Sequence, residues 1–173
     1  VWVATGDGRV VMLGRDRVEE LSSEASADAG MRALMGDAEA VLVRDAGLQD
    51  RVTFHSYLPH KDIISYYQHA DVVVNPSLSE TFGISIVEGM ACGVPVVGTR
   101  VGGMLDTIVD DVGRADPAED PESLEKAVCE ILDNRTTARE LGAAGRQRAI
   151  TQFTWKARAN RLLDVYRRVC SAS

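Results

Sequence analysis

The sequence has little of what a membrane, secreted or nucleic-acid-binding protein needs. No apolar run approaches the roughly 20 residues that span a bilayer, and the chain opens without the basic region or cleavage site of a signal peptide. Three cysteines, odd in number and without a C-x-x-C pair, do not indicate a disulfide framework. The net charge of −7 argues against nonspecific nucleic-acid binding, which needs clustered positive charge. We therefore expect a cytoplasmic protein with reduced cysteines and no nucleic-acid partner.

Metal and nucleophile chemistry are not indicated either. The histidines have no metal-ligand spacing with cysteine or acidic partners, so we expect no metal site; they are His55, His60 and His69. Asp110 and Asp111 are adjacent and therefore lack the spacing of a metal-binding pair, so we interpret them as part of a solvated turn.

The second half of the chain alternates apolar strands with amphipathic helices. Residues 71–74 are apolar and β-branched after their first residue, as in a parallel strand buried on both faces, and a second such strand is expected at 94–97. Helices are expected over 61–69, 84–91, 122–133, 137–151 and 156–169. Strands separated by helices favour right-handed crossovers. The expected fold class is therefore α/β, a Rossmann-like doubly wound parallel sheet flanked by helices, in a single domain over residues 1–173.

Residues 1–47 are harder to place. Short strands are expected at 1–4 and 10–13, each followed by a glycine-containing turn. The acidic, serine- and alanine-rich run 18–29 fits either a helix or a loop, whereas 31–46 is predicted to be helical.

The strongest functional signal is a pair of glutamates, Glu80 and Glu88, that flank the start of the helix expected at 84–91. Ligands of doubly wound sheets bind beyond the carboxyl ends of the strands, and Glu80 lies just past the strand at 71–74. The amides near Phe82 and Gly83 and the helix dipole favour an anion there. Glu88 could accept hydrogen bonds from vicinal hydroxyls such as those of a ribose.

A purely structural alternative exists for Glu88. The segment Ser85-Ile86-Val87-Glu88 matches a helix capping box, in which the glutamate bonds the backbone at the helix start. The spacing alone leaves both roles open.

Several motifs, in order, resemble the retaining glycosyltransferase family 4. The segment from Glu80 to Ala91 matches the E-x7-E signature of that family. Further similar segments are Pro76-Ser77, Gly93-Val94-Pro95-Val96-Val97, Val101-Gly102-Gly103, Asp50-Arg51-Val52-Thr53-Phe54, Tyr66-Tyr67-x-x-Ala70-Asp71, and the stretch from Gly142 to Trp155. The resemblance covers roughly Leu48 to the carboxyl end.

The resemblance implies the donor-binding, carboxyl-terminal half of a GT-B enzyme, which transfers sugar from a nucleotide-diphosphate sugar with retention and generally needs no metal or other cofactor. In such enzymes the residue matching Glu88 binds the ribose, and the one matching Glu80, the catalytic candidate, touches the donor sugar near the reacting phosphate. The implied donor-binding residues are Glu80, Thr81, Phe82, Gly83, Ile84, Glu88 and Leu58, the last at the position that packs on the base.

The resemblance also implies a partner half that this sequence does not contain. The acceptor would bind to that amino-terminal half, and the helix within 156–173 would pack toward it. The arginines of this helix are expected at the surface, with docking to an anionic membrane as an alternative; they are Arg158, Arg161, Arg167 and Arg168.

The sequence departs from the family pattern in four places. Gly14-Arg15 fits the first half of the phosphate-binding G-R…K-G element, but no Lys-Gly follows. Asp106 stands where a glutamate is usual after the double glycine. Gly113-Arg114-Ala115-Asp116 replaces an apolar strand and is a residue shorter, which predicts a loose sheet edge. The amino-terminal Rossmann half is absent.

Two other functions stay open on this sequence. One is a module that binds a nucleotide but transfers nothing, and the other is a sugar-nucleotide epimerase of the GT-B type. A phosphorylase fits less well because it needs a lysine that binds pyridoxal phosphate. The lysines of this sequence all lie in predicted helices where that role is not expected; they are Lys61, Lys126 and Lys156.

Overall fold

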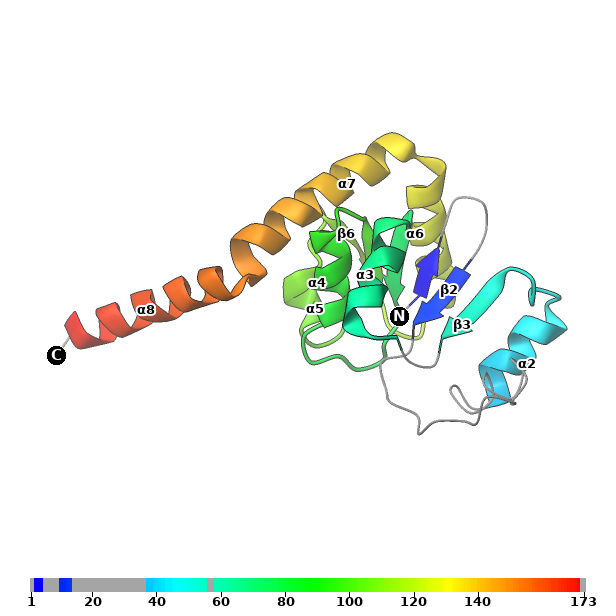
Figure 1. Ribbon diagram of the computed structural model, residues 1–173. Helices are drawn as coiled ribbons and strands as arrows, with labels where there is room; N and C mark the ends of the chain where they lie inside the picture. Colours follow the sequence, from blue (N-terminus) through cyan, green and yellow to red (C-terminus); the bar gives the residue numbers. More distant parts are fainter. Residues whose placement is uncertain (1, 5–9, 14–36, 56–57, 172–173) are drawn as a thin grey trace.

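A six-stranded sheet forms the centre of the part of the chain that the computed structural model describes, which is residues 2–4, 10–13, 37–55 and 58–171 (Figure 1). The strand order is β3-β2-β1-β4-β5-β6. The strands are β1 (Trp2–Ala4), β2 (Val10–Leu13), β3 (Val52–His55), β4 (Val72–Asn75), β5 (Val96–Thr99) and β6 (Gly113–Asp116). The helices are α2 (Asp37–Asp45), α3 (His60–Gln68), α4 (Ile84–Ala91), α5 (Met104–Thr107), α6 (Pro121–Asp133), α7 (Arg135–Arg148), the π-helical turn η1 (Ala149–Phe153) and α8 (Trp155–Ser171).

The sheet is parallel, as predicted, except at β1. Strands β4, β5 and β6 pair in parallel, as do β2 and β3, whereas β1 is antiparallel to both of its neighbours, β2 and β4. The reason lies in chain length. Five residues, 5–9, separate β1 from β2. Parallel neighbours need a crossover of about a dozen residues or more, so this connection allows only an antiparallel pair.

Helices cover both faces of the sheet, because successive side chains of a strand point to opposite sides. On one face Val73 and Val96 pack against α3 and α4, and on the other Val72, Val74 and Val97 pack against α6 and α7. Helix α7 reaches both layers, since Leu141 belongs to the second cluster and Ala144 packs against the first. The doubly wound α/β fold predicted from the sequence is confirmed.

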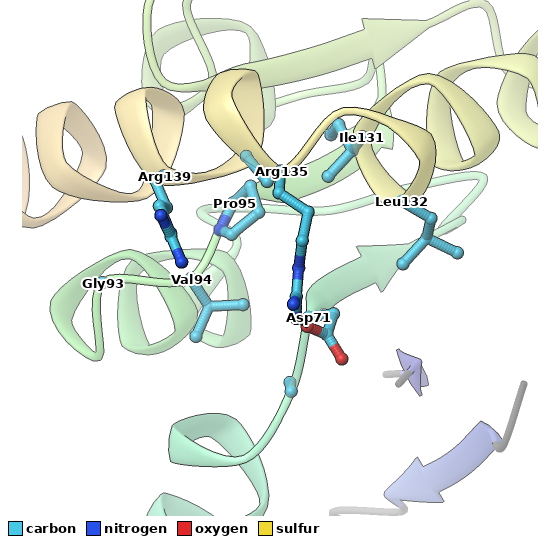
Figure 2. A pocket seen from close by; sticks show the side chains of 10 residues that line it. Asp71, Gly93, Val94, Pro95, Ile131, Leu132, Arg135 and Arg139 are labelled. Atoms are coloured by element: carbon cyan, nitrogen blue, oxygen red, sulfur yellow. Dashed lines mark ion pairs between the residues drawn. The ribbon is translucent and has the colours of Figure 1, made fainter. Parts of the chain in front are cut away.

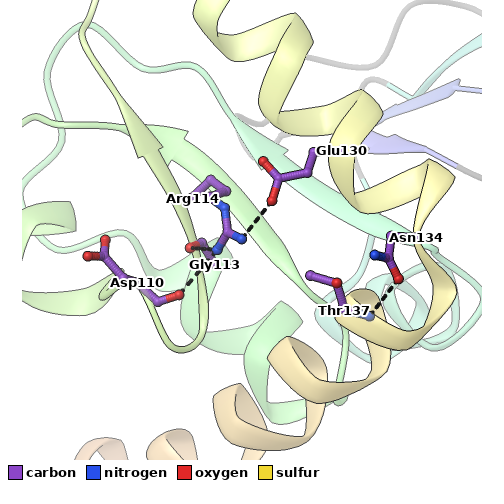
Figure 3. A network of polar contacts seen from close by, with 6 residues as sticks. All are labelled: Asp110, Gly113, Arg114, Glu130, Asn134 and Thr137. Carbon is purple, nitrogen blue, oxygen red and sulfur yellow. Dashed lines mark hydrogen bonds and ion pairs between the residues drawn. The ribbon is translucent and has the colours of Figure 1, made fainter.

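The predicted loose edge at residues 113–116 is wrong. Strand β6 pairs with β5 along its whole length, from Val96 opposite Gly113 to Thr99 opposite Asp116. Figure 3 shows that Arg114 also ties this edge to α6, because its Nη2 lies 2.8 Å from Oε1 of Glu130. Backbone pairing does not need apolar side chains, and the ion pair engages the polar side chain of an edge strand.

Helix α7 begins earlier than expected, and α8 buries none of its own residues in this domain. Asn134 caps α7 by accepting a hydrogen bond from the Thr137 amide, so the helix begins at Arg135 rather than at residue 137 (Figure 3). Helix α8 then extends away from the sheet (Figure 1) and contains no buried residue. Its exposed side chains include an apolar stripe, formed by Leu162, Leu163, Tyr166 and Val169.

Three expectations in the amino-terminal part fall partly or wholly outside the described residues. The helix predicted at 31–46 is found over Asp37–Asp45, and residues 31–36 are not described. The run 18–29 and the Gly14-Arg15 pair also lie outside the described residues.

Glu119, in the loop between β6 and α6, has a left-handed backbone, with φ of 65°. This conformation costs about 1 kcal/mol or more for a residue that has a Cβ, and glycine avoids that cost. We expect Glu119→Gly to raise the free energy of unfolding by about 1 kcal/mol in urea denaturation. Glu119→Ala is the control, because it removes the carboxylate but keeps the Cβ. Equal stabilisation by alanine would show that the strain is not in the backbone.

Candidate functional site

Two loops meet at the carboxyl edge of the parallel strands. Loop 76–83 joins β4 to α4, and loop 100–103 joins β5 to α5. The two are bonded directly, because the Gly103 amide donates to the Glu80 carbonyl at 3.1 Å. Both predicted carboxylates, on loop 76–83 and on α4, therefore lie at the edge where doubly wound sheets bind their ligands.

Asn75, the last residue of β4, fixes the geometry of loop 76–83. It is buried, and its Nδ2 donates to Oγ of Ser85 at 3.1 Å and to Oε2 of Glu80 at 3.4 Å. Its Oδ1 accepts from the amide and the hydroxyl of Ser77, at 3.2 and 2.6 Å. A buried amide with its polar atoms engaged holds the strand end, the loop and the first turn of α4 in one arrangement.

The Glu80 carboxylate faces the amides near Phe82 and Gly83, where the sequence predicts an anionic ligand. Burial alone raises the pKa of Glu80, but hydrogen bonds from the amides of Gly83, Phe82 and Thr81 and from Asn75 outweigh it and hold that pKa below its ordinary value. The Phe82 amide lies 3.4 Å from Oε1. The prediction that anions are favoured here is consistent with this arrangement, but the amides are already engaged by an internal anion.

The capping-box interpretation of Glu88 is wrong. The N-cap of α4 is Gly83, whose φ of 78° is left-handed, and no side chain caps this helix. Ser85 therefore lies inside the helix, where its hydroxyl accepts from Asn75. Glu88 instead turns toward α3: Nε2 of His60 lies 3.0 Å from Oε1, and the Tyr67 hydroxyl donates to Oε2 at 3.2 Å.

Loop 100–103 packs against loop 76–83 so closely that it requires glycine. A Cβ placed on Gly102, whose φ is +46°, would stand 1.8 Å from the Glu80 carbonyl oxygen. A Cβ on Gly103 would stand 2.3 Å from the carbonyl oxygen of Thr81. The double glycine therefore sets the position of the backbone that carries Glu80.

Phe82 anchors the other side of loop 76–83. Its ring meets that of Phe153 edge-on, with centroids 5.8 Å apart, and the Arg158 guanidinium lies over both rings at 5.5 and 5.4 Å. The Phe82 carbonyl accepts from Thr107 at 3.1 Å. Arg158, predicted to be a surface residue, is exposed, but it also joins the first turns of α8 to this loop.

The remaining predicted residues are less constrained. The side chains of Thr81 and Ile84 are exposed, and Ile84 retains 54% of its accessible surface. Leu58 is half-buried, lies two residues before His60, and packs against the core cluster that contains Tyr67. Its contact with a base stays a prediction.

Sequence reasoning missed three polar residues of this site, namely His60, Tyr67 and Asn75. Tyr67 stood out only as part of a segment that resembles the family, and no signal links it to a carboxylate 21 residues later. Asn75 did carry a signal, since a polar residue that ends an otherwise apolar buried strand needs hydrogen-bond partners.

A separate cavity of about 420 Å³ lies at the opposite edge of the sheet, before β4 and β5 (Figure 2). Arg135 and Arg139 project from α7 toward it, and Arg135 lies 3.9 Å from Asp71. None of the predicted site residues lines this cavity. Within the described residues there is also no group of three or more potential metal ligands, and no helix is long and apolar enough to cross a membrane.

Comparison with known proteins agrees with this architecture. Residues 36–148 match the family of glycosyl transferases group 1. The chain is 39% identical over 126 residues to a D-inositol 3-phosphate glycosyltransferase of Corynebacterium diphtheriae, an alignment that covers 72% of this chain and 29% of that protein. A D-inositol 3-phosphate glycosyltransferase of Mycolicibacterium smegmatis is 36% identical over 131 residues, covering 75% and 30%. The matched part of the chain thus covers less than a third of the length of these curated relatives.

Solved structures give the same result for the fold. Sucrose-phosphate synthase from Thermosynechococcus elongatus superposes with a TM-score of 0.73 and 34% identity, covering 94% of this chain and 39% of that one. The carboxyl-terminal domain of a group 1 glycosyl transferase from Francisella tularensis, at 24% identity, superposes with a TM-score of 0.64 over 72% of this chain and 65% of that one. Anabaena HepE in complex with UDP shares the fold at 19% identity, with a TM-score of 0.70 over 93% of this chain and 49% of that one. The chain belongs to the group 1 glycosyl transferases, family 4, and forms their carboxyl-terminal GT-B domain.

Proposed function

We propose that this domain binds the nucleotide-diphosphate sugar of a retaining glycosyltransferase, with Glu88 on the ribose and Glu80 on the donor sugar. The observation that carries the proposal is the placement of the two carboxylates. Both lie at the carboxyl edge of the parallel strands, one beside the first turn of α4 and one in its second turn, with a helix start between them.

The chemistry of the donor fits this arrangement. A diphosphate suits the positive dipole end at the start of α4. Glu80 accepts bonds from amides of its own loop, so its carboxylate is charged at neutral pH and ready to accept hydrogen bonds from sugar hydroxyls. Loop 100–103, bonded to the Glu80 carbonyl, keeps the carboxylate in place.

Transfer would then rest on electrostatics. As the bond from the sugar to the diphosphate breaks, negative charge builds on the departing phosphate. The positive end of the α4 dipole, fixed in advance at that position, stabilises the charge without having to reorganise. Glu80 would hold the sugar, and the ribose contact of Glu88 would fix the nucleotide, so that the reacting bond stays over the helix start.

The relatives support a nucleoside diphosphate as the ligand. HepE structures contain UDP with glucose, or UDP-glucose. The named relatives are glycosyltransferases and a sucrose-phosphate synthase. UDP is accordingly the first nucleotide to test, beside GDP and ADP.

The acceptor would be bound by a second half of the enzyme, toward which α8 packs. Six side chains on α8 are large, apolar and exposed, namely Trp155, Leu162, Leu163, Val165, Tyr166 and Val169. Such a face on a helix that buries nothing in its own domain is typical of a docking surface. The relatives are more than three times as long as the matched segment, which leaves room for that half.

Isothermal titration calorimetry on this chain tests the proposal. We expect one of UDP, GDP and ADP to bind, and Glu88→Gln to bind it about tenfold more weakly, the scale of a lost hydrogen bond to a charged group. Glu125→Gln on α6, an exposed glutamate, is the control and should bind as the wild type does. Binding that survives Glu88→Gln unchanged would contradict the assignment of the ribose.

A module that only binds is the second candidate, and a transfer assay separates it. This chain alone should bind nucleotide without transferring sugar, whereas the complete enzyme should do both. A complete enzyme that binds the nucleotide sugar but never transfers or epimerises it would favour the binding-only function.

A further inference from the structure

We propose that helix α3 is part of the nucleoside site. Tyr67 positions the Glu88 carboxylate, and His60 is an exchangeable partner of that carboxylate that the ribose hydroxyls displace. This inference rests on the proposed function, because it assumes that Glu88 receives ribose hydroxyls. It adds two residues, and a division of labour between them, to that site.

Tyr67 has the properties of a fixed positioning group. The residue is 1% exposed and belongs to the core cluster that also contains Val73 and Ile86. A ring packed on all sides has one place for its hydroxyl, and here the hydroxyl donates to Oε2 of Glu88 at 3.2 Å. The Glu88 side chain is only 20% exposed, so this bond is partly shielded from water. It fixes the rotation of the carboxylate.

His60 contacts the other oxygen but from solvent. Its Nε2 lies 3.0 Å from Oε1 of Glu88, while its side chain is 70% exposed. An exposed pair of this kind contributes little net free energy, because water replaces either partner at small cost. The imidazole is therefore the partner that an incoming hydroxyl displaces.

The two bonds lie on different oxygens of the carboxylate. Tyr67 donates to Oε2, and His60 contacts Oε1. Ribose hydroxyls that approach from the exposed side would therefore displace His60 and leave the Tyr67 bond intact.

The test compares two tyrosines of the same helix. Tyr67→Phe removes the hydroxyl that meets Glu88. Tyr66→Phe, the matched control, removes a hydroxyl that lies 2.9 Å from Nε2 of His55 instead. Calorimetry on this chain would use whichever of UDP, GDP and ADP the wild type binds most tightly, and the 2′,3′-dideoxy form of the same nucleotide, with thermal unfolding to check the fold.

For the ribonucleotide we expect about tenfold weaker binding by Tyr67→Phe, the effect of losing one hydrogen bond to a charged group, and no change by Tyr66→Phe. For the dideoxy nucleotide, which has no hydroxyls to place, Tyr67→Phe should bind as the wild type does. His60→Ala should bind the ribonucleotide as tightly as the wild type or up to about fivefold more tightly, the scale of an exposed pair.

Each contrary result has a distinct meaning. Equal loss on both nucleotides, or no loss on either, would overturn the positioning role of Tyr67 while leaving the donor site in place. A tenfold loss in His60→Ala would overturn its exchangeable role and make it a direct contact. A wild-type chain that binds none of the three nucleotides would overturn the proposed function and this inference with it.

Discussion

Replacing Glu80 with glutamine is expected to slow sugar transfer by the complete enzyme about 100-fold, the scale of a donor held slightly out of place. Glutamine keeps the length of the side chain and one acceptor oxygen. It also places an NH2 group against the amides of loop 76–83, which now donate to the carboxylate. The donor sugar would lose a charged acceptor, and the loop would lose its internal anion.

The same substitution should give a stability signature on this chain. The folded-state pKa of Glu80 is lowered, so the carboxylate stabilises the fold at pH values above its unfolded pKa, and this contribution is lost as pH falls through the folded pKa. We expect Glu80→Gln to be less stable than the wild type near pH 7 by about 1 kcal/mol, and the difference to disappear in acid.

Urea denaturation across pH measures this difference, with Glu125→Gln as the surface control. A control that shows the same pH dependence would assign the effect to net charge. Full transfer activity in the Glu80→Gln enzyme would remove Glu80 from the site.

Gly102→Ala is expected to have the largest effect on the fold of the site. The added Cβ would overlap the Glu80 carbonyl oxygen, 1.8 Å away, at a position whose φ of +46° already disfavours a side chain. Overpacking against backbone costs about 3 kcal/mol here, at the upper end of its usual range. Loop 76–83 must move to relieve the overlap, so nucleotide binding should be lost as well.

Gly47→Ala separates backbone strain from the overlap. Gly47 has a left-handed φ of +67°, but nothing lies within 4 Å of the added Cβ. The Gly47→Ala variant should lose only about 1 kcal/mol of unfolding free energy and keep nucleotide binding, because the substitution adds backbone strain but no overlap. Equal losses in the two variants, measured by urea denaturation, would show that the close contact of Gly102 with Glu80 is unimportant.

The elements around Glu80 were predictable because local chemistry determines them. A β-branched run predicts β4, and the glycine after it together with an apolar period predicts α4, whose bounds match the expectation. The position of Glu80 follows, since parallel strands place their carboxyl ends at one edge. Its bonds to the amides of Gly83 and Phe82 are also local, within three residues along the chain.

What the sequence could not predict depends on distant parts of the chain. The partners of Glu88 come from α3, 21 and 28 residues earlier, and only the packing of α3 beside α4 brings them together. The capping box failed because Gly83, in a left-handed conformation, begins the helix two residues before Ser85. The expectation that another half covers the exposed stripe of α8 stays a prediction.

The measurement that tests the donor site most directly is an amide NMR titration of this chain with UDP, GDP and ADP. We expect one of them to shift the amide signals of Phe82, Gly83 and Glu88 together. The amides of Ala138 and Arg139, at the cavity on the opposite edge of the sheet, should stay unchanged. Shifts confined to the amides around that cavity, or no shift with any of the three nucleotides, would contradict a donor site at Glu80 and Glu88.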